Sequence, residues 1–209
     1  MESSSAQGFV VKYLGVQDYE SVFASQQLFT RNRVEQDPDE LWVVAHPPVF
    51  TLGQAGKTEH VLDAGLIPLV RSDRGGQVTY HGPGQVVGYP ILDLENFFTD
   101  IHKYLRFLED VIINTLAEYG LTGQRSAGET GVWLDVGTPF ARKICAMGVR
   151  ASRWVTMHCF ALNVTTNLGY FDHIIPCGIK GKAVTSMEAE LNRKISMEEV
   201  QEKIEKQNQ

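Results

Sequence analysis

The 209-residue chain carries 19 basic and 25 acidic residues, a net charge of −6, with 43% hydrophobic and 21% charged residues. This length suits one domain over residues 1–209, with short flexible termini and a core large enough to fold without disulfides. The balance of apolar and charged residues excludes disordered, fibrous and coiled-coil classes. The net negative charge disfavours binding to nucleic acid.

The sequence shows no signal for secretion or membrane insertion. Residues 1–5 lack the basic and apolar regions of a secretory signal, and no run reaches the roughly 18 apolar residues of a membrane span. Cys145, Cys159 and Cys177 have no spacing typical of a zinc site or a disulfide framework. We therefore expect a cytoplasmic protein with reduced thiols, no bound metal and no membrane contact.

The N-terminal half alternates short apolar runs with turn residues. Asp18 is a suitable N-cap for a helix with apolar residues at helical spacing, which ends before Pro38. His46-Pro47-Pro48 separates two apolar runs. The strands expected here cover residues 9–14, 41–45, 49–52, 67–70 and 86–94.

The C-terminal half opens with the clearest helix of the chain, residues 101–119, where apolar side chains recur with a period near 3.6. Thr99 or Asp100 can cap its start. Residues 131–136, 143–150 and 154–164 are expected to form a meander, and Ser196 with Glu199 fits a capping box for a last helix. Runs of strands around a long helix indicate an α+β fold, with a mixed sheet flanked by helices.

The segment from Arg74 to Gln85 is the most unusual of the chain. Its twelve residues include four glycines, together with side chains that donate hydrogen bonds. Glycines let backbone approach a ligand closely and adopt positive φ angles, so a binding loop and a simple hairpin or wide turn are both open. The spacing matches neither a Walker loop nor a dinucleotide fingerprint, which argues against a nucleotide site.

Cys177 lies between Pro176 and Gly178, in a turn where its sulfur can be exposed. Cys145 and Cys159 fall within apolar runs, where a cysteine is usually a small buried hydrophobe. A thiol with a pKa of about 8.5 is only a few per cent ionised at neutral pH, so a reactive Cys177 needs a partner. Lys143 is one candidate, unless it is simply a solvated strand end.

His81 and His158 remain alternative partners for the thiol. For the other histidines the sequence indicates no more than surface or capping positions. These are His46, His60, His102 and His173.

Four motifs, taken together and in order, resemble the lipoate-protein octanoyltransferases over almost the whole chain. They are Arg74 to Gln85, Arg142 to Gly148, His158 to Asn163, and Pro176-Cys177-Gly178. The resemblance implies a catalytic domain of the biotin and lipoyl protein ligase type. It also implies that Cys177 is the acyl-thioester nucleophile and that Lys143 lowers its pKa.

The resemblance further implies a substrate site, formed by Arg74, Gly75, Gly76, Gln77, Val78, Thr79, Tyr80, His81, Ala146, Met147, Gly148, Cys159, Phe160 and Ala161. Tyr80, Met147 and Phe160 are candidates for the walls of an acyl tunnel. The chain departs from the family at Cys159, where a glycine is usual. Cys159 is then either a small filler, which we favour, or a second thiol near the tunnel.

The implied reaction transfers an octanoyl group to a protein lysine in two steps. The donor is octanoyl-acyl carrier protein, which holds the group on phosphopantetheine, so that no further cofactor is needed. The acceptors are lipoyl domains of 2-oxoacid dehydrogenase complexes and the H protein of glycine cleavage. Because the carrier protein is acidic, we expect a cationic rim drawn from Arg71, Arg74, Arg142, Arg150, Arg153, Lys180 and Lys182.

Four alternatives to this reaction remain. The first is an ATP-dependent lipoate ligase of the same fold, and the second is a transferase with another octanoylated protein as donor. The third is a module that binds carrier or lipoyl domains without chemistry, and the fourth is a hydrolase. Activity that survives Cys177→Ala would indicate the ligase, and donor competition would identify the donor. No octanoyl adduct at all would favour binding only, and release of free octanoate without an acceptor would indicate a hydrolase.

Overall fold

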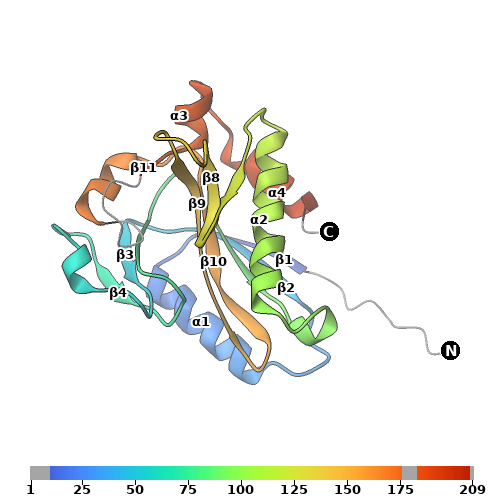
Figure 1. The fold of residues 1–209 in the computed structure, drawn as a ribbon. Coiled ribbons are helices and arrows are strands. Elements are labelled where there is room, and N and C mark those ends of the chain that lie inside the picture. Colours follow the sequence, from blue (N-terminus) through green and yellow to red (C-terminus); the bar gives the residue numbers. More distant parts are fainter. Residues whose placement is uncertain (1–9, 176–182, 208–209) are drawn as a thin grey trace.

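The computed structural model describes residues 10–175 and 183–207 (Figure 1). A mixed main sheet lies at the centre of this part of the chain, with strand order β1-β2-β6-β10-β9-β8-β7. β1 runs parallel to β2, whereas the pairs from β2 to β7 are antiparallel, and β11 adds to β9 in parallel. The strands are β1 (Val10–Val16), β2 (Glu40–Ala45), β6 (Gln85–Ile91), β7 (Gln124–Ser126), β8 (Glu129–Leu134), β9 (Arg142–Ser152), β10 (Val155–Asn163) and β11 (Ala183–Val184).

A smaller sheet with order β4-β3-β5 lies to one side of the main sheet (Figure 1). It consists of β3 (Val49–Leu52), β4 (Leu69–Arg71) and β5 (Val78–His81). Its apolar face packs on the 3-10 helix η3 (Leu168–His173), where Phe50, Tyr80 and Phe171 share one cluster. Because β5 and β6 are joined by a short turn, the small sheet is held close to the centre of the main sheet.

Helices cover both faces of the main sheet. α2 (Ile101–Ala117) packs on β8, β9 and α4 (Met197–Gln207), whereas α1 (Tyr19–Asn32) packs on β10. Alternation along β2 shows the two faces directly: Leu41 and Val43 belong to the core under α2, and Trp42 and Val44 to the core under α1. The remaining helices are η1 (Thr58–His60), η2 (Leu94–Asn96) and α3 (Met187–Leu191).

Local sequence explains where the main helices begin. Asp18 accepts a hydrogen bond from the Ser21 backbone, and Asp100 accepts from the first turn of α2, so that each carboxylate satisfies amides that lack a helical partner. The Ser196 hydroxyl likewise accepts a hydrogen bond from the Glu199 amide at the start of α4. The apolar stripe of α2 is buried against the sheet, where each large side chain contributes roughly 1.5–3 kcal/mol.

The α+β class with a mixed sheet, predicted from the sequence, is confirmed. The meander of β8, β9 and β10 is also present, but the predicted turn at 151–153 begins later, because Ala151 and Ser152 still pair with β10. That residues 1–209 make up one domain stays a prediction. In residues 10–175 and 183–207, none of the helices combines the length and the apolar character that a bilayer span requires.

Candidate active site

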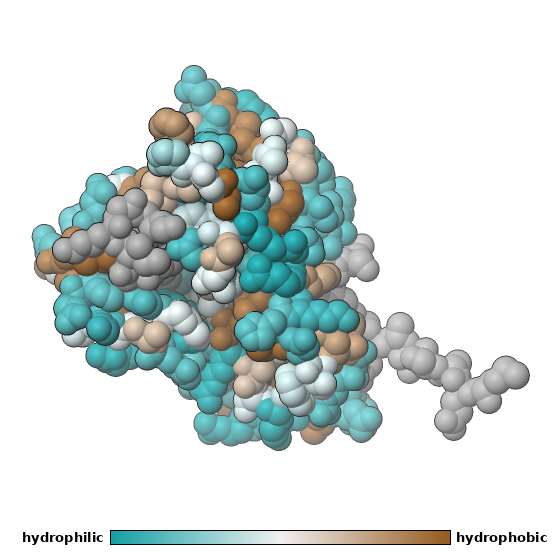
Figure 2. Space-filling view, viewed as in Figure 1, coloured by the Kyte–Doolittle hydropathy of each residue, from teal (hydrophilic) through white to brown (hydrophobic). Residues whose placement is uncertain are grey.

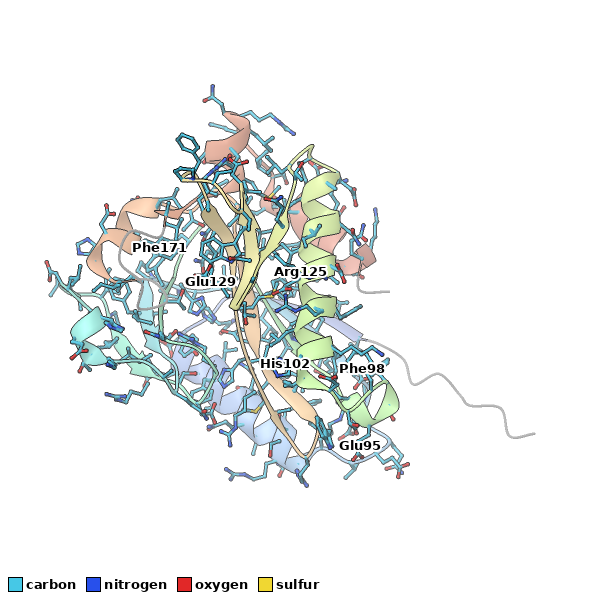
Figure 3. The ribbon with its side chains drawn as sticks, viewed as in Figure 1. Glu95, Phe98, His102, Arg125, Glu129 and Phe171 are labelled. Atoms are coloured by element: carbon cyan, nitrogen blue, oxygen red, sulfur yellow. The ribbon has the colours of Figure 1, made fainter. Side chains whose placement is uncertain are left out.

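A cavity of about 520 Å³ lies between the small sheet and the main sheet. Glu129, at the start of β8, and Phe171, in η3, both line it and come from different parts of the fold (Figure 3). Figure 2 shows hydrophilic and hydrophobic residues side by side across the middle of the view. The lining residues are Ala55, Arg74, Gly75, Gly76, Gln77, Val78, Thr79, His81, Gln85, Leu105, Gly128, Glu129, Thr130, Lys143, Ala146, Met147, Gly148, Val149, Ala161, Asn163, Phe171 and Val184.

Arg74 organises the glycine-rich segment from within. Only 5% of Arg74 is exposed, and its guanidinium donates to the carbonyl oxygens of Thr51 at 2.9 Å, Gln77 at 2.7 Å and Gly75 at 2.9 Å. These bonds fix the loop to β3 and satisfy carbonyl groups that the fold buries. Arg74 therefore shapes the cavity wall and is not part of an exposed cationic rim, which corrects that expectation.

Two glycines are required where the loop meets β9. Gly76 adopts a φ of +84°, in the left-handed region that favours glycine. A Cβ on Gly148 would lie 2.8 Å from the Gly75 carbonyl oxygen and 3.1 Å from Cδ of Arg74. The segment expected as a binding loop therefore approaches β9 so closely that a side chain at position 148 would displace it.

Strand alternation sorts the residues at the end of this segment. Thr79 and His81 line the cavity, whereas Tyr80, between them, packs against Phe50, Tyr170 and Phe171 with 1% of its surface exposed. Tyr80 therefore lies in the core of the small sheet and not among the cavity-lining residues. It had been expected to form a tunnel wall.

Lys143 lies at the start of β9, beside the cavity. Only 8% of its surface is exposed. Its Nζ donates a hydrogen bond to the carbonyl oxygen of Thr130 at 3.1 Å and lies 4.7 Å from the centroid of the Trp133 ring. Trp133 pairs with Lys143 across β8 and β9, so the register of the two strands sets this contact. The ammonium group is thus held in place at the cavity wall, unlike a solvated strand end.

The central strands contribute small residues to the cavity. Ala146, Met147 and Gly148 of β9 and Ala161 of β10 line it, and Ala161 pairs with Ala146 between the strands. Phe160 is fully buried in the core under α2 and is absent from the lining, so it lies outside the expected tunnel wall.

The described residues do not include the predicted nucleophile. Pro176, Cys177 and Gly178 lie outside the described residues, as do Lys180, Lys182 and the side chain of Cys159. The contact between Lys143 and Cys177 therefore stays a prediction.

Three other expected rim cations, Arg142, Arg150 and Arg153, are held by neighbouring groups. Arg142 forms ion pairs with Glu190 and Asp135, each at 2.5 Å, and Arg150 pairs with Asp73. Arg153 donates to backbone carbonyls at the end of α1. Arg71, at the end of β4, is exposed.

Three histidines lie together on the α1 side of the site. Burial lowers the pKa values of His46 and His158, and lowers the pKa of His81 well below its usual value of 6.5. His158 binds Asp73 through Nε2 and adopts a φ of +68°. His46 had been expected at the surface or as a cap, but it is buried and contacts the Tyr89 hydroxyl at 2.7 Å.

Sequence reasoning missed part of the cavity wall. Leu105 of α2 and residues 128–130 come from segments without motif character, and only the tertiary fold brings them to the site. Gln85 and Asn163 also line the cavity; they lie in the motifs named above, but no role was predicted for either residue. Two polar residues at the ends of apolar strands are a signal of a buried polar contact.

The fold defines a class of protein. An archaeal lipoate protein ligase from Thermoplasma acidophilum superimposes with a TM-score of 0.76 at 19% identity, covering 96% of this chain and 82% of that chain. A biotin protein ligase from Aquifex aeolicus gives a TM-score of 0.53 at 14% identity, covering 94% and 65%. The fold is therefore that of the biotin and lipoyl protein ligases.

Sequence comparison narrows this class. The family model for the lipoyl protein ligase A/B catalytic domain matches residues 18–209. An octanoyltransferase from Christiangramia forsetii is 59% identical over 93% of this chain and 91% of its own length. The chain belongs to the octanoyltransferases of the lipoyl protein ligase A/B family. It is an acyltransferase that transfers octanoyl groups in protein lipoylation, which confirms the resemblance drawn from the motifs.

Proposed function

We propose that the chain takes its octanoyl group from octanoyl-acyl carrier protein, holds it as a thioester on Cys177, and passes it to a lysine of lipoyl domains. The acceptors are those of the 2-oxoacid dehydrogenase complexes and the H protein of glycine cleavage. The observation that carries this proposal is a buried ammonium group, that of Lys143, on the wall of a 520 Å³ cavity in a member of the octanoyltransferases.

Lys143 supplies what a cysteine nucleophile needs. An ammonium group beside a thiol favours the thiolate by direct charge attraction, and this attraction is stronger where water is partly excluded. The contact with Trp133 and the bond to Thr130 restrict the side chain, so that little conformational entropy is lost when it meets its partner. This arrangement fits a group that stabilises a thiolate.

The first step exchanges one thioester for another. The Cys177 thiolate attacks the carbonyl carbon, the carbon–sulfur bond to phosphopantetheine breaks, and Lys143 protonates the departing sulfur. Because the donor already holds an activated acyl group, this step requires no nucleotide and no additional cofactor. The second step forms an amide from the thioester, which is downhill and completes a ping-pong cycle.

The cavity provides for an eight-carbon chain. Its volume is within the range of about 300–1,000 Å³ that is usual for small-ligand sites. Burial of each methylene group contributes roughly 0.8 kcal/mol, so an octanoyl chain gains several kcal/mol over a short acyl group. Ala146, Met147 and Ala161 supply apolar surface for this contact.

Two partner proteins must reach the same cavity. The carrier protein is acidic and this chain has a net charge of −6, so docking requires local cations. Arg71 is exposed near the glycine-rich segment, whereas the charge of Arg150 is offset by its ion pair with Asp73. Lys180 and Lys182 adjoin the predicted nucleophile in sequence. We expect carrier binding to weaken as the salt concentration rises.

Intact-mass measurement tests the proposal. The protein is incubated with octanoyl-acyl carrier protein without nucleotide, and a mass gain of one octanoyl group is expected. Cys177→Ser should not show this mass gain, because it cannot form the thioester. Cys145→Ala, a substitution in the core, should still show it. Absence of the adduct together with ATP-dependent transfer of free lipoate would contradict the proposal and favour a ligase.

A further inference from the structure

A chain of buried hydrogen bonds runs from the cavity into the main sheet. Nδ1 of His81 lies 3.3 Å from Oε1 of Gln85, and Nε2 of Gln85 donates to the Tyr80 carbonyl at 3.0 Å and to Oδ1 of Asn163 at 2.9 Å. Nδ2 of Asn163 then donates to the Thr185 carbonyl at 3.0 Å. His81, Gln85 and Asn163 are all buried.

Two backbone carbonyls fix the direction of every bond in this chain. A carbonyl oxygen only accepts, so the atom of Gln85 that faces Tyr80 is its NH₂ group, and the atom of Asn163 that faces Thr185 is its NH₂ group. Gln85 therefore presents its oxygen to His81. Nδ1 of His81 must carry the proton, which leaves the lone pair on Nε2.

Nε2 of His81 is a buried acceptor in a residue of the cavity wall. His81 lines the cavity with 1% of its surface exposed, and Nε2 has no hydrogen-bond partner among the residues that the structure describes. A buried acceptor without a partner is costly, and a catalytic role is one explanation for such an atom. Because His81 lines the cavity, we expect the missing donor to come from a group bound there.

We infer that Nε2 of His81 accepts the proton of the lysine amine that attacks the octanoyl thioester, and that Gln85 and Asn163 are positioning residues that hold the required tautomer. This inference rests on the proposed two-step transfer. The proton donor is a primary amine of a protein acceptor, present in the cavity only in the second step. His81 is therefore assigned to aminolysis and not to formation of the acyl-enzyme.

The proton balance of the step is complete without another reagent. The neutral amine attacks the thioester carbonyl, and its N–H becomes acidic as the N–C bond forms. Nε2 of His81 takes this proton, the carbon–sulfur bond breaks with its electron pair on sulfur, and the imidazolium then returns the proton to the thiolate. An amide and a thiol are formed from an amine and a thioester.

The surroundings keep His81 neutral between turnovers. Tyr19 of α1 stacks on its ring, with the ring centroids 5.6 Å apart. His46, directly after β2, Arg74 of the glycine-rich segment and His158 of β10 also act on its charge. Burial lowers the pKa of His81 most strongly, and the cationic or protonatable neighbours lower it further. Lys143 and Glu129 also face the cavity, and Glu129 accepts a hydrogen bond from Ser126 at 2.7 Å.

Separate measurement of the two half-reactions tests the inference. The rate of acyl-enzyme formation and the rate of its decay on adding a lipoyl domain are followed by rapid-quench mass spectrometry. His81→Asn should slow the second step by about a hundredfold and at least ten times more than the first. His102→Asn, at the exposed start of α2 (Figure 3), should change neither rate.

Nitrogen-15 NMR of the wild-type protein gives a second readout, which does not require that a variant folds. The His81 ring should show a protonated Nδ1 and an unprotonated Nε2 near neutral pH. Three results would overturn the inference. The first is an Nε2–H tautomer, and the second is equal slowing of both steps by His81→Asn. The third is selective slowing of aminolysis by Glu129→Gln instead of by His81→Asn. If the wild-type protein forms no acyl-enzyme, it is the proposed function that fails.

Discussion

Lys143 and Trp133 face each other across β8 and β9, with the ammonium nitrogen 4.7 Å from the centroid of the indole ring. The ring face attracts a cation, and such contacts contribute about 0.5–2 kcal/mol, more where water is excluded. Both residues are buried. The register of the two strands therefore fixes a positively charged group at the cavity wall. This relationship connects the fold to the proposed chemistry.

Trp133→Leu should slow acyl-enzyme formation by about 2- to 30-fold, because the ammonium loses its ring contact while the charge remains. Single-turnover acylation, followed by intact mass, measures this effect. Trp154→Leu alters an exposed tryptophan in the turn between β9 and β10 and should leave the rate unchanged. Equal rates for Trp133→Leu and the wild-type protein would show that the ring does not hold the cation.

Arg74→Ala should destabilise the protein by about 3 kcal/mol or more, because buried carbonyls of Thr51, Gly75 and Gln77 lose their donors. Arg74→Lys should recover only part of this loss, since an ammonium cannot reproduce the planar geometry of a guanidinium. Urea unfolding measures both changes. Arg193→Ala, an exposed substitution, should shift the free energy of unfolding by less than about 0.5 kcal/mol.

Ala146→Leu should change the preferred acyl length. The added side chain occupies cavity space beside Ala161, so the longer donors lose methylene contacts of about 0.8 kcal/mol each. We expect the ratio of octanoyl to butyryl transfer to fall about tenfold in competition assays. Ala117→Leu, at the exposed end of α2, should leave the ratio unchanged, and an unchanged ratio in Ala146→Leu would place the acyl chain elsewhere.

Stability should fall as the pH decreases below about 6.5. His46, His81 and His158 have pKa values that burial lowers in the folded state, so the unfolded chain binds protons first. Their contribution is fully present above the unfolded pKa and is lost as the pH falls through the folded pKa values. Each histidine can add up to about 1.4 kcal/mol per pH unit to the slope.

Urea unfolding between about pH 5 and pH 8 measures this slope. His46→Gln should make the slope shallower, since one buried imidazole is removed, and the exposed His102→Asn should leave it unchanged. Stability that rises on acidification in the same range would contradict the pKa assignment of these histidines.

Periodicity accounts for what the sequence predicts well. The 3.6-residue pattern and the Asp100 cap locate α2, and the apolar runs locate β9 and β10. β5 was missed since it lies within the glycine-rich segment, where pairing with β3 overrides a weak local preference. β7, β11 and α3 are too short to give a pattern.

The site shows where sequence patterns stop being informative. Motif position alone cannot distinguish the two faces of a strand, so Tyr80 and Phe160 were grouped with neighbours that line the cavity. The alternation of Thr79, Tyr80 and His81 could have separated them. By contrast, the contributions of Leu105 and Thr130 depend on how α2 and β8 pack on the sheet, which no local pattern encodes.

The proposed reaction depends on a covalent octanoyl group on Cys177, which Lys143 makes possible and which lysine acceptors remove. After incubation with octanoyl-acyl carrier protein, peptide mapping should locate the octanoyl group on Cys177, and a lipoyl domain added without nucleotide should take up the group as the adduct disappears. Lys143→Met should form the adduct at least a hundredfold more slowly. An octanoyl group on a different residue, or one that persists when the acceptor is added, would contradict this reaction.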